Sequence, residues 1–167
     1  MRFISETPVN VLKDTNVKIA RSSVQEFSSK NKYDMVISHM CVQTVSDLND
    51  FFLSICKLSN VKSTFCFSFP HPCFYNAYKR FFKEDEYQYS RTAYKNIALT
   101  ITTQPNRPIN GIPYHHRPLN EYIKGLKRAG MCLKDMDEIF PDKGVQSLYG
   151  SPWKEPRYIA LHASLIK

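Results

Sequence analysis

The stretch that decides the fold runs over residues 33–69 and reads YDMVISHMCVQTVSDLNDFFLSICKLSNVKSTFCFSF. It starts with an apolar run over 33–38, and such a run between polar loops is typical of a strand buried on both faces. Apolar residues then recur at helical spacing over 46–58, with Ser46 as the expected N-cap. A second apolar strand follows over 63–69 and ends at a proline. The order strand, helix, strand predicts a parallel α/β sheet.

The pattern extends on both sides of this stretch. We expect further elements as follows: a strand at 16–20, a strand at 97–103, a turn at 105–108, a returning strand at 111–116, a helix at 119–129, a strand at 131–139, a loop at 142–157 and a closing strand at 158–166. Gly130 is the expected C′ glycine of the second helix. The sequence therefore predicts one domain over 1–167, with an aromatic and basic insertion over 71–116.

Charge and cysteine content limit the functional classes. Lys and Arg number 23 and Asp and Glu 15, which gives a net charge of +8. Such an excess favours nucleic acid, phosphorylated ligands or an acidic partner, or serves only solubility. The five cysteines form no CxxC pair, so we expect reduced, buried thiols and no metal site. With no visible signal peptide and no apolar run long enough for a membrane span, we expect a cytoplasmic protein.

The glycines exclude one class of binding loop. All five glycines lie at or beyond position 111. A phosphate-binding P-loop and a dinucleotide fingerprint both need glycines where backbone amides approach phosphate. Neither loop is therefore present in the first 110 residues.

Several segments resemble class I S-adenosylmethionine-dependent methyltransferases, in particular the small-molecule enzymes of the type 11 group. YDMVISHMCVQTVSDL (33–48) is similar to the fourth-strand motif of that family, and TFCFSFPHP (64–72) to its fifth strand. YHHRPLNEYIKGLKRAGM (114–131) is the most specific match, and YIALHASLIK (158–167) resembles the seventh strand. The resemblance implies a Rossmann-like sheet, S-adenosylmethionine as cofactor and methyl transfer to a small molecule.

The resemblance also implies a gap. Residues 3–27 look like the family's second strand, the following helix and the third strand. This placement leaves no residues for the first strand, its glycine-rich cofactor loop and the first helix. The fourth strand would then lie at an exposed edge of the sheet. We expect another chain, a second copy or a rearranged N-terminus to cover that edge.

Cofactor contacts are expected from two places. Ser23 and Val24 stand where the family approaches the adenine. Ser38 and His39 follow the fourth strand, and ligands of open parallel sheets bind at the carboxyl ends of the strands. The other interpretation of Ser38 and His39 is a loop that only precedes the helix.

Substrate contacts are expected from His71 after the fifth strand, from Tyr75 and Tyr78 in the insertion, and from Arg117. His71 could equally be a turn histidine, and the aromatic residues could form a small auxiliary core. His115 or His116 could act as a general base, with Arg117 holding a carboxylate or phosphate of the substrate. Arg117 could instead have a structural role.

Three functions remain open from the sequence. The first is S-adenosylmethionine-dependent methylation of a small molecule, with a second chain or copy completing the cofactor site. The second is a non-catalytic remnant or regulatory subunit that retains the methyltransferase fold. The third is a basic nucleic-acid-binding module, which no recognised binding motif supports.

Overall fold

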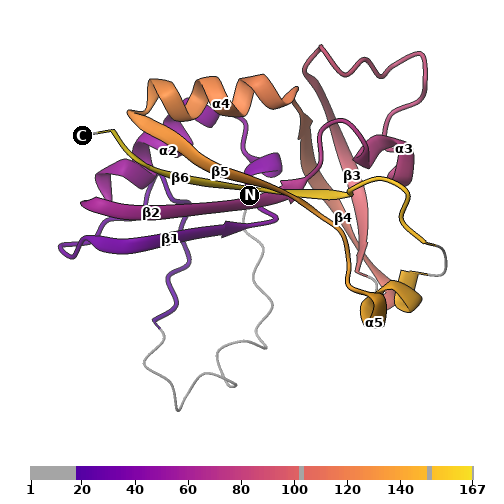
Figure 1. Cartoon of the computed structure of the whole chain (residues 1–167), viewed down its shortest axis with the longest axis horizontal. Coiled ribbons are helices and arrows are strands. Elements are labelled where there is room, and N and C mark those ends of the chain that lie inside the picture. Colours follow the sequence, from indigo (N-terminus) through magenta and orange to yellow (C-terminus); the bar gives the residue numbers. More distant parts are fainter. Residues whose placement is uncertain (1–17, 102–103, 150–151, 167) are drawn as a thin grey trace.

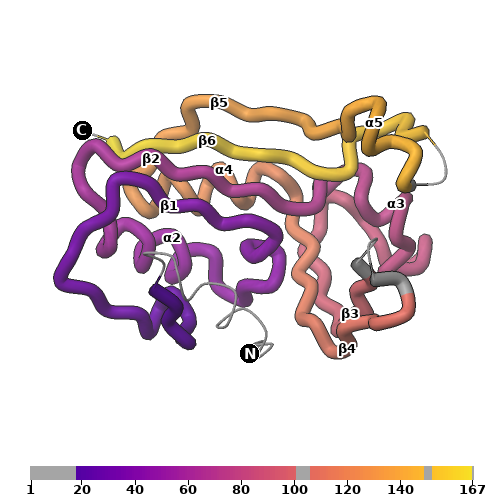
Figure 2. Tube along the Cα trace, turned by 90° about the horizontal axis from the view of Figure 1, so that it is seen from below, coloured from indigo at the N-terminus to yellow at the C-terminus, as the bar shows by residue number. Residues whose placement is uncertain are grey.

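The computed structural model describes residues 18–101, 104–149 and 152–166. Four of the described strands form one sheet, in the order β1 (Tyr33–His39), β2 (Ser59–Pro70), β6 (Tyr158–Leu165) and β5 (Met131–Ile139). β1 and β2 are parallel, and β6 runs antiparallel to both of its neighbours. Helices α2 (Leu48–Lys57) and α4 (Leu119–Arg128) lie on the same face of this sheet (Figures 1 and 2). The predicted α/β architecture is confirmed.

The main hydrophobic core fills the space between the two helices and the sheet. Successive inward-facing positions of β2 and β6 supply it, as the strand period of two requires. Its fully buried members from the sheet and from the helices include Phe65, Phe67, Phe69, Met131, Ile159, Leu161, Ala163, Phe52, Ile55 and Leu126. Edge-to-face contacts between phenylalanine rings of α2 and β2 contribute to this packing.

The opposite face of the sheet carries no helix among the described residues. On β1, the side chains of Met35 and Ile37 are 60 % and 66 % exposed. His39 lies on the same face, where its Nδ1 is 2.7 Å from the hydroxyl of Ser68. The prediction that 33–38 is buried on both faces is therefore wrong, because Met35 and Ile37 on one face of β1 are exposed. Among the described strands β1 also lies at an edge of the sheet, as the resemblance implied.

Several predicted boundaries move in the structure. Asp47, not Ser46, caps α2, because its carboxylate accepts hydrogen bonds from the backbone N–H groups of residues 49 and 50. β2 begins at residue 59, where it pairs with Tyr33, four residues before the predicted start. The second helix and the strand after it lie where expected, and Gly130 has the positive φ of 77° typical of a C′ glycine.

The insertion over 71–116 forms a unit at one end of the sheet. It contains helix α3 (Tyr75–Lys79) and an antiparallel pair, β3 (Ala93–Ile101) and β4 (Gln104–His116). The prediction of an antiparallel partner is confirmed, but the predicted turn at 105–108 is wrong because these residues belong to β4. Aromatic and aliphatic side chains form a second core here, which consists of Tyr75, Phe82, Ile97, Ile112 and Tyr114.

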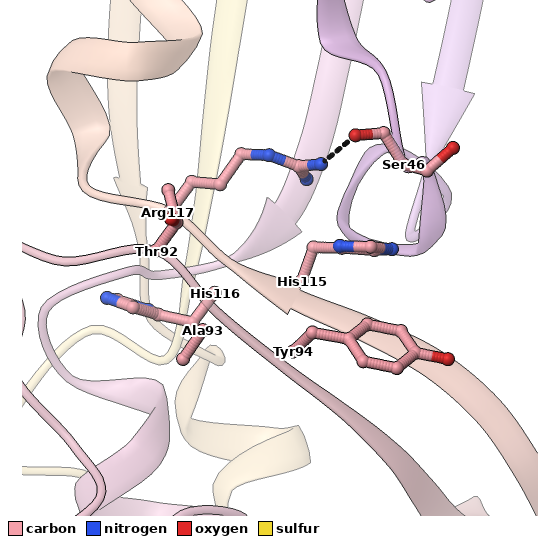
Figure 3. A pocket seen from close by; sticks show the side chains of 7 residues that line it. All are labelled: Ser46, Thr92, Ala93, Tyr94, His115, His116 and Arg117. Atoms are coloured by element: carbon pink, nitrogen blue, oxygen red, sulfur yellow. Dashed lines mark hydrogen bonds between the residues drawn. The ribbon is translucent and has the colours of Figure 1, made fainter.

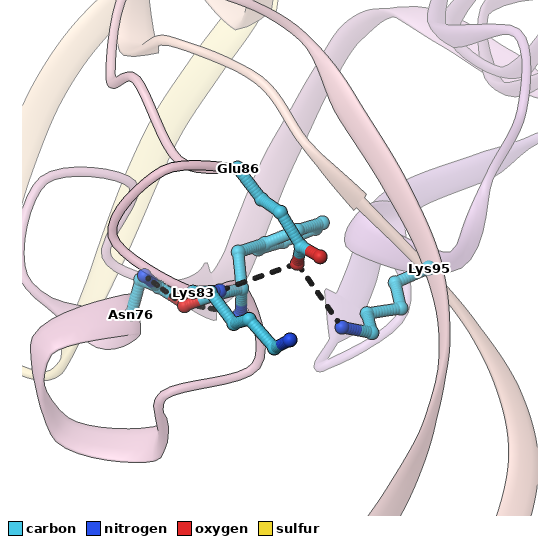
Figure 4. Close-up of polar contacts among 5 residues, drawn as sticks. Asn76, Lys83, Glu86 and Lys95 are labelled. Atoms are coloured by element: carbon cyan, nitrogen blue, oxygen red, sulfur yellow. Dashed lines mark hydrogen bonds and ion pairs between the residues drawn. The ribbon is translucent and has the colours of Figure 1, made fainter.

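Polar contacts tie the connection after α3 to β3 (Figure 4). The amide of Asn76 accepts from the backbone N–H of Phe82 at 2.9 Å and donates to its carbonyl at 3.2 Å. The Glu86 carboxylate accepts from the backbone N–H of Lys83 and pairs with Lys95, both at 3.3 Å. The Lys95 pair is exposed and contributes little, so the buried aromatic side chains hold this unit together.

The remaining described elements are short: the 3₁₀ turns η1 (Val42–Thr44) and η2 (Ser147–Tyr149) and helix α5 (Lys143–Gln146). α5 and η2 occupy part of the predicted loop at 142–157. Of the strand predicted at 16–20, residues 16 and 17 lie outside the described residues, and 18–20 are not in a strand. No helix in the described part of the chain is long and apolar enough to cross a membrane.

Candidate functional site

A cavity of about 520 Å³ opens at the carboxyl end of β1. Its walls come from segment 22–25, from the loop 40–46 that follows β1, and from Phe51 of α2. The insertion closes it with Leu99 and the 112–113 stretch of β4. Residues far apart in the chain thus meet where ligands bind in open α/β sheets.

The loop after β1 makes a sharp turn into this cavity. Met40 has a φ of 50°, a left-handed conformation that is rare for a residue with a side chain. Its backbone N–H donates to the carbonyl of Ser68 at 2.7 Å, which fixes the turn against β2. Such strained residues persist where the surrounding structure determines them, often at binding sites.

Gln43 is the most unusual polar group of the cavity wall. Its side chain is buried and only 6 % exposed. The amide nitrogen donates to the carbonyl of Met40 at 2.8 Å, but the amide oxygen Oε1 has no hydrogen-bond partner. A buried oxygen without a partner costs about 1–3 kcal/mol. A ligand N–H or O–H that reached Oε1 would recover that free energy.

A narrow apolar extension of about 20 Å³ continues behind Gln43. Side chains from both sides of the insertion line it, namely Tyr75, Phe81, Ile97, Leu99, Ile112 and Tyr114. Burial raises the pKa of Tyr75 well above its ordinary value, and its tyrosine neighbours Tyr158 and Tyr114 raise it further. Tyr75 therefore stays neutral and presents an aromatic wall.

The predicted cofactor residues fall into two groups. Ser23 and Val24 line the 520 Å³ cavity, and the Ser23 hydroxyl already accepts from the backbone N–H of Glu26 at 3.2 Å. Ser38 and His39 are not among the residues that line it. Ser38 is buried with its hydroxyl unpartnered, whereas His39 lies on the uncovered face of the sheet.

The sequence predicts His71 at the mouth of the site, and this is wrong. In the structure His71 is buried beside β5. Its Nδ1 accepts from the backbone N–H of Cys73 at 3.2 Å, so Nε2 carries the proton and donates to Glu138 at 3.1 Å. Burial lowers the pKa of His71, and the Glu138 carboxylate opposes this only in part. These contacts describe a structural histidine.

Tyr78, also predicted as a substrate residue, lies outside the cavity walls described above. Its ring is partly exposed and packs under the guanidinium of Arg157, 3.5 Å from the ring centroid. A cation that close to an aromatic face contributes about 0.5–2 kcal/mol, more when it is desolvated. The contact joins the insertion to the segment that directly precedes β6.

The three adjacent residues His115, His116 and Arg117 point into different surroundings (Figure 3). His116 is almost fully buried and donates from Nε2 to the carbonyl of Tyr89 at 3.0 Å. His115 lines a second cavity, of about 300 Å³, and packs against the ring of Tyr94 at 4.8 Å between centroids. Among the described residues, the imidazole of His115 forms no hydrogen bond, whereas that of His116 does.

Arg117 fastens the end of β4 to the segment before α2. Its Nη2 donates to the carbonyls of Val45 and Ser46 at 2.6 and 2.7 Å. The structural role considered for this residue is thus present. Because Ser46 lines both the 520 Å³ and the 300 Å³ cavity, Arg117 also supports the wall between them.

Sequence reasoning missed the part of the site between Met40 and Ser46. The rule that ligands bind after parallel strands points to this loop, but it does not distinguish one residue from another. Gln43 shares the wall of the narrow extension with Leu99 and Ile112 of the insertion, which are distant in the sequence, so the burial of its unpartnered oxygen is not visible in the local sequence.

Comparison of the sequence with models of protein families finds no match, and comparison with curated proteins also finds none. Solved structures do match. A protein of Listeria monocytogenes, assigned as an S-adenosylmethionine-dependent methyltransferase, superposes with a TM-score of 0.70 at 16 % identity, over 98 % of this chain and 78 % of its own. An S-adenosylmethionine-dependent methyltransferase of Mesorhizobium loti matches with a TM-score of 0.63 at 17 % identity, over 95 % of this chain and 76 % of its own.

A third match carries ligands. The 1,6-didemethyltoxoflavin-N1-methyltransferase of Burkholderia thailandensis, solved with 1,6-didemethyltoxoflavin and S-adenosylhomocysteine bound, has a TM-score of 0.52 at 12 % identity. The superposition covers 89 % of this chain and 50 % of that enzyme. The predicted resemblance is confirmed at the level of the fold: this chain has the Rossmann-like fold of class I S-adenosylmethionine-dependent methyltransferases.

Proposed function

We propose that this chain takes part in methyl transfer from S-adenosylmethionine to a small molecule, with the 520 Å³ cavity as the reaction site. The observation that carries the proposal is the position of this cavity at the carboxyl end of β1, within a methyltransferase fold. The Burkholderia enzyme holds a small molecule and S-adenosylhomocysteine, so the fold accommodates this chemistry. The five free cysteines agree with a reducing compartment such as the cytoplasm.

The cavity walls fit part of the cofactor. Val24 and Phe51 offer apolar surface, and the hydroxyl of Ser22 and the amide of Gln25 offer hydrogen-bonding groups. No Asp or Glu is among the described residues that line the cavity, so the two ribose hydroxyls lack the strong anchor that a carboxylate gives. The backbone amides of a glycine-rich loop are also missing from residues 1–110.

The chain's own residues would orient the substrate. The cofactor supplies a methyl group that is already reactive, so the protein mainly positions the accepting atom. Oε1 of Gln43 can accept a hydrogen bond from the substrate's amine or hydroxyl, and the aromatic extension behind it can hold an apolar part. The insertion over 71–116 would then serve as the substrate lid.

We propose that a second chain or copy completes the cofactor site. The exposed Met35 and Ile37 of edge strand β1 support this, because they leave both a strand edge and an apolar sheet face available. A strand added in parallel to β1 would end beside the loop 40–46. Its following loop would reach the cavity from the side where anchoring groups are lacking.

Calorimetric titration with S-adenosylhomocysteine tests the proposed site. We expect the chain alone to bind weakly, with a dissociation constant above about 100 μM, since the ribose anchor is absent. Cys41→Trp should abolish this binding, because Cys41 is exposed at the cavity wall and the indole would fill the space. Leu148→Trp is the matched control, since Leu148 is exposed on η2 and outside the cavity. Equal binding by both variants would rule out the cavity as the cofactor site.

A regulatory subunit is the second candidate, and the lack of acidic residues in the cavity wall favours it. A shared catalytic site and a regulatory subunit differ in where the cofactor binds when a partner protein is present. The tagged chain, purified from its native cells with any bound protein, is titrated with S-adenosylhomocysteine in the same way. Tight binding that Cys41→Trp abolishes supports the shared catalytic site, whereas tight binding that survives Cys41→Trp places the cofactor in the partner alone.

A further inference from the structure

Arg117 carries a buried charge that no acidic group neutralises. Its side chain is 8 % exposed, and among the described residues no carboxylate forms an ion pair with it. Nη2 donates to two backbone carbonyls, while Nη1 has no hydrogen-bond partner. Burial lowers the pKa of Arg117, and the Tyr122 phenol and the more distant Asp47 carboxylate only partly offset this. An uncompensated buried cation costs several kcal/mol unless a counter-charge is supplied.

The 300 Å³ cavity offers room for that counter-charge beside Arg117. Thr92 supplies a hydroxyl at its wall, His115 an imidazole, and Ser46 a polar backbone segment (Figure 3). No acidic side chain lines it in the described part of the chain. Its described walls therefore carry one fixed positive charge, that of Arg117, together with hydroxyl and imidazole groups that can donate to an anion, and no negative charge.

The nearest acidic side chains already have other partners. Asp47 and Glu121 line an adjoining cavity of about 190 Å³ that also contains Arg117 and Arg128. Asp47 caps α2, and Glu121 pairs with Lys124 at 2.9 Å. Ser46, Thr92 and Arg117 line both cavities, but neither carboxylate lines the 300 Å³ cavity in front of His115.

The pKa of His115 is also affected by the uncompensated charge of Arg117. Burial lowers the pKa of its imidazole first, and the positive charge of Arg117 lowers it further. Arg117 follows the end of β4 two residues after His115, so the two groups repel each other when His115 is protonated. An anion bound between His115 and Arg117 would offset this repulsion and could accept hydrogen bonds from both side chains.

We propose that the cavity in front of Arg117, His115 and Thr92 is an anion site that takes a carboxylate or phosphate group of the substrate. Arginine and a protonated histidine suit such oxyanions, because their N–H groups donate charge-assisted hydrogen bonds. The segment 45–46, which Arg117 holds, separates this site from the 520 Å³ cavity. An anionic group bound here would place the rest of the molecule against the wall that the two cavities share. The assignment of the anion to a substrate rests on the proposed function, but anion binding itself does not.

The test uses inorganic phosphate and acetate as probes on the whole chain. Imidazole resonances of histidine-labelled protein are followed by NMR through the pH range of histidine titration, at constant ionic strength. Either bound anion should raise the pKa of His115 by about one unit, which means about tenfold tighter anion binding to the protonated ring. The imidazole resonances of His162, which is exposed on β6, should not respond to either anion. Saturation by phosphate alone indicates a phosphate-bearing substrate, and saturation by acetate a carboxylate.

Variants separate this site from general attraction to a basic protein. Arg117→Gln and Thr92→Val should each weaken phosphate binding at least tenfold, because each removes a donor or the charge. Arg91→Gln is the matched control: it removes an exposed cation one residue from Thr92 that is not in the cavity wall. Arg117 holds residues 45 and 46, so Arg117→Gln could unfold the protein. In that case Thr92→Val alone tests whether phosphate binds in this cavity. A His115 pKa that neither probe moves, or equal phosphate binding by Thr92→Val and Arg91→Gln, would overturn the proposal, whatever the titration with S-adenosylhomocysteine shows.

Discussion

The uncovered face of the sheet predicts that two isoleucines tolerate the same substitution very differently. Ile37 on β1 is 66 % exposed, whereas Ile159 on β6 faces the helices and is 0 % exposed. Full burial of an isoleucine side chain contributes about 1.5–3 kcal/mol, so the one third of Ile37 that is buried contributes at most about 1 kcal/mol. Threonine keeps the β-branched shape, so strand preference changes little. Ile37→Thr should therefore cost less than about 1 kcal/mol.

Ile159→Thr is the matched comparison. It removes a buried carbon, which costs about 1 kcal/mol, and places a hydroxyl without a partner in the core, which costs about 1–3 kcal/mol more. The free energy of unfolding should fall by about 2–4 kcal/mol in total. Urea denaturation followed by circular dichroism measures both values, and unchanged slopes would confirm comparable unfolding.

The size of the Ile37→Thr effect also reports on the partner. A loss as large as that of Ile159→Thr would refute the inference that this face is open in the isolated chain. In that case the measurement is repeated over a range of protein concentrations. A cost that rises with concentration would show that a second copy covers β1, because association stabilises the folded state by mass action.

Three further predictions concern stability. Gly125→Ala should lower the melting temperature, because the added Cβ would lie 3.0 Å from Cε2 of Phe52; overpacking costs about 1–3 kcal/mol and outweighs the gain of about 1 kcal/mol in helix propensity. Asp47→Ala removes the N-cap of α2 and should lower the free energy of unfolding, measured by urea denaturation, by about 1 kcal/mol. Asp47→Asn should keep most of that stability, because asparagine is also a good N-cap. His71 has a folded-state pKa below its ordinary value of 6.5, so the unfolded chain binds more protons and stability falls as the pH drops below about 6.5. His71→Gln should make this loss on acidification smaller, measured as the melting temperature between about pH 5 and 7.

The sequence predicts best those elements whose signals are local. The helix that ends at Gly130 and the strand after it lie where periodicity and the C′ glycine put them. The N-cap differs by one residue because Ser46 and Asp47 are both good caps, and only the three-dimensional arrangement selects Asp47. In the structure the Ser46 carbonyl instead accepts from Arg117, a contact between residues 71 positions apart.

The predicted turn at 105–108 fails for a different reason. Pro105 and Pro108 interrupt most strands because they lack a backbone N–H. β3 and β4 form a two-stranded sheet, so every strand in it is an edge strand and some positions need no partner. Whether a strand is central or at an edge depends on the assembled sheet and is not visible in the local sequence.

The candidate site shows the same limit more strongly. In the sequence, His115 and His116 are equally plausible as the general base and His71 is a candidate substrate contact, but packing gives the three different environments. His71 and His116 are buried and hydrogen-bonded to Glu138 and to the Tyr89 carbonyl, which fixes each ring in one structural contact. Both ring nitrogens of His71 have partners and it lines none of the cavities described, so it is not available to take a proton there. His116 does line the 300 Å³ cavity, with its Nε2 held by the Tyr89 carbonyl.

His115 differs because β4 places its side chain on the opposite side of the strand from His116, as the period of two requires. That side is bounded by the segment held by Arg117, and not by the aromatic core of the insertion. A histidine near a fixed positive charge is a poor general base when the site is empty, since its proton-bound form is disfavoured. An anion at Arg117 would raise the His115 pKa, because it stabilises the protonated ring. Since segment 45–46 separates His115 from the 520 Å³ cavity, this histidine is placed to hold an anionic end of a substrate and not to take a proton from the methyl-accepting atom.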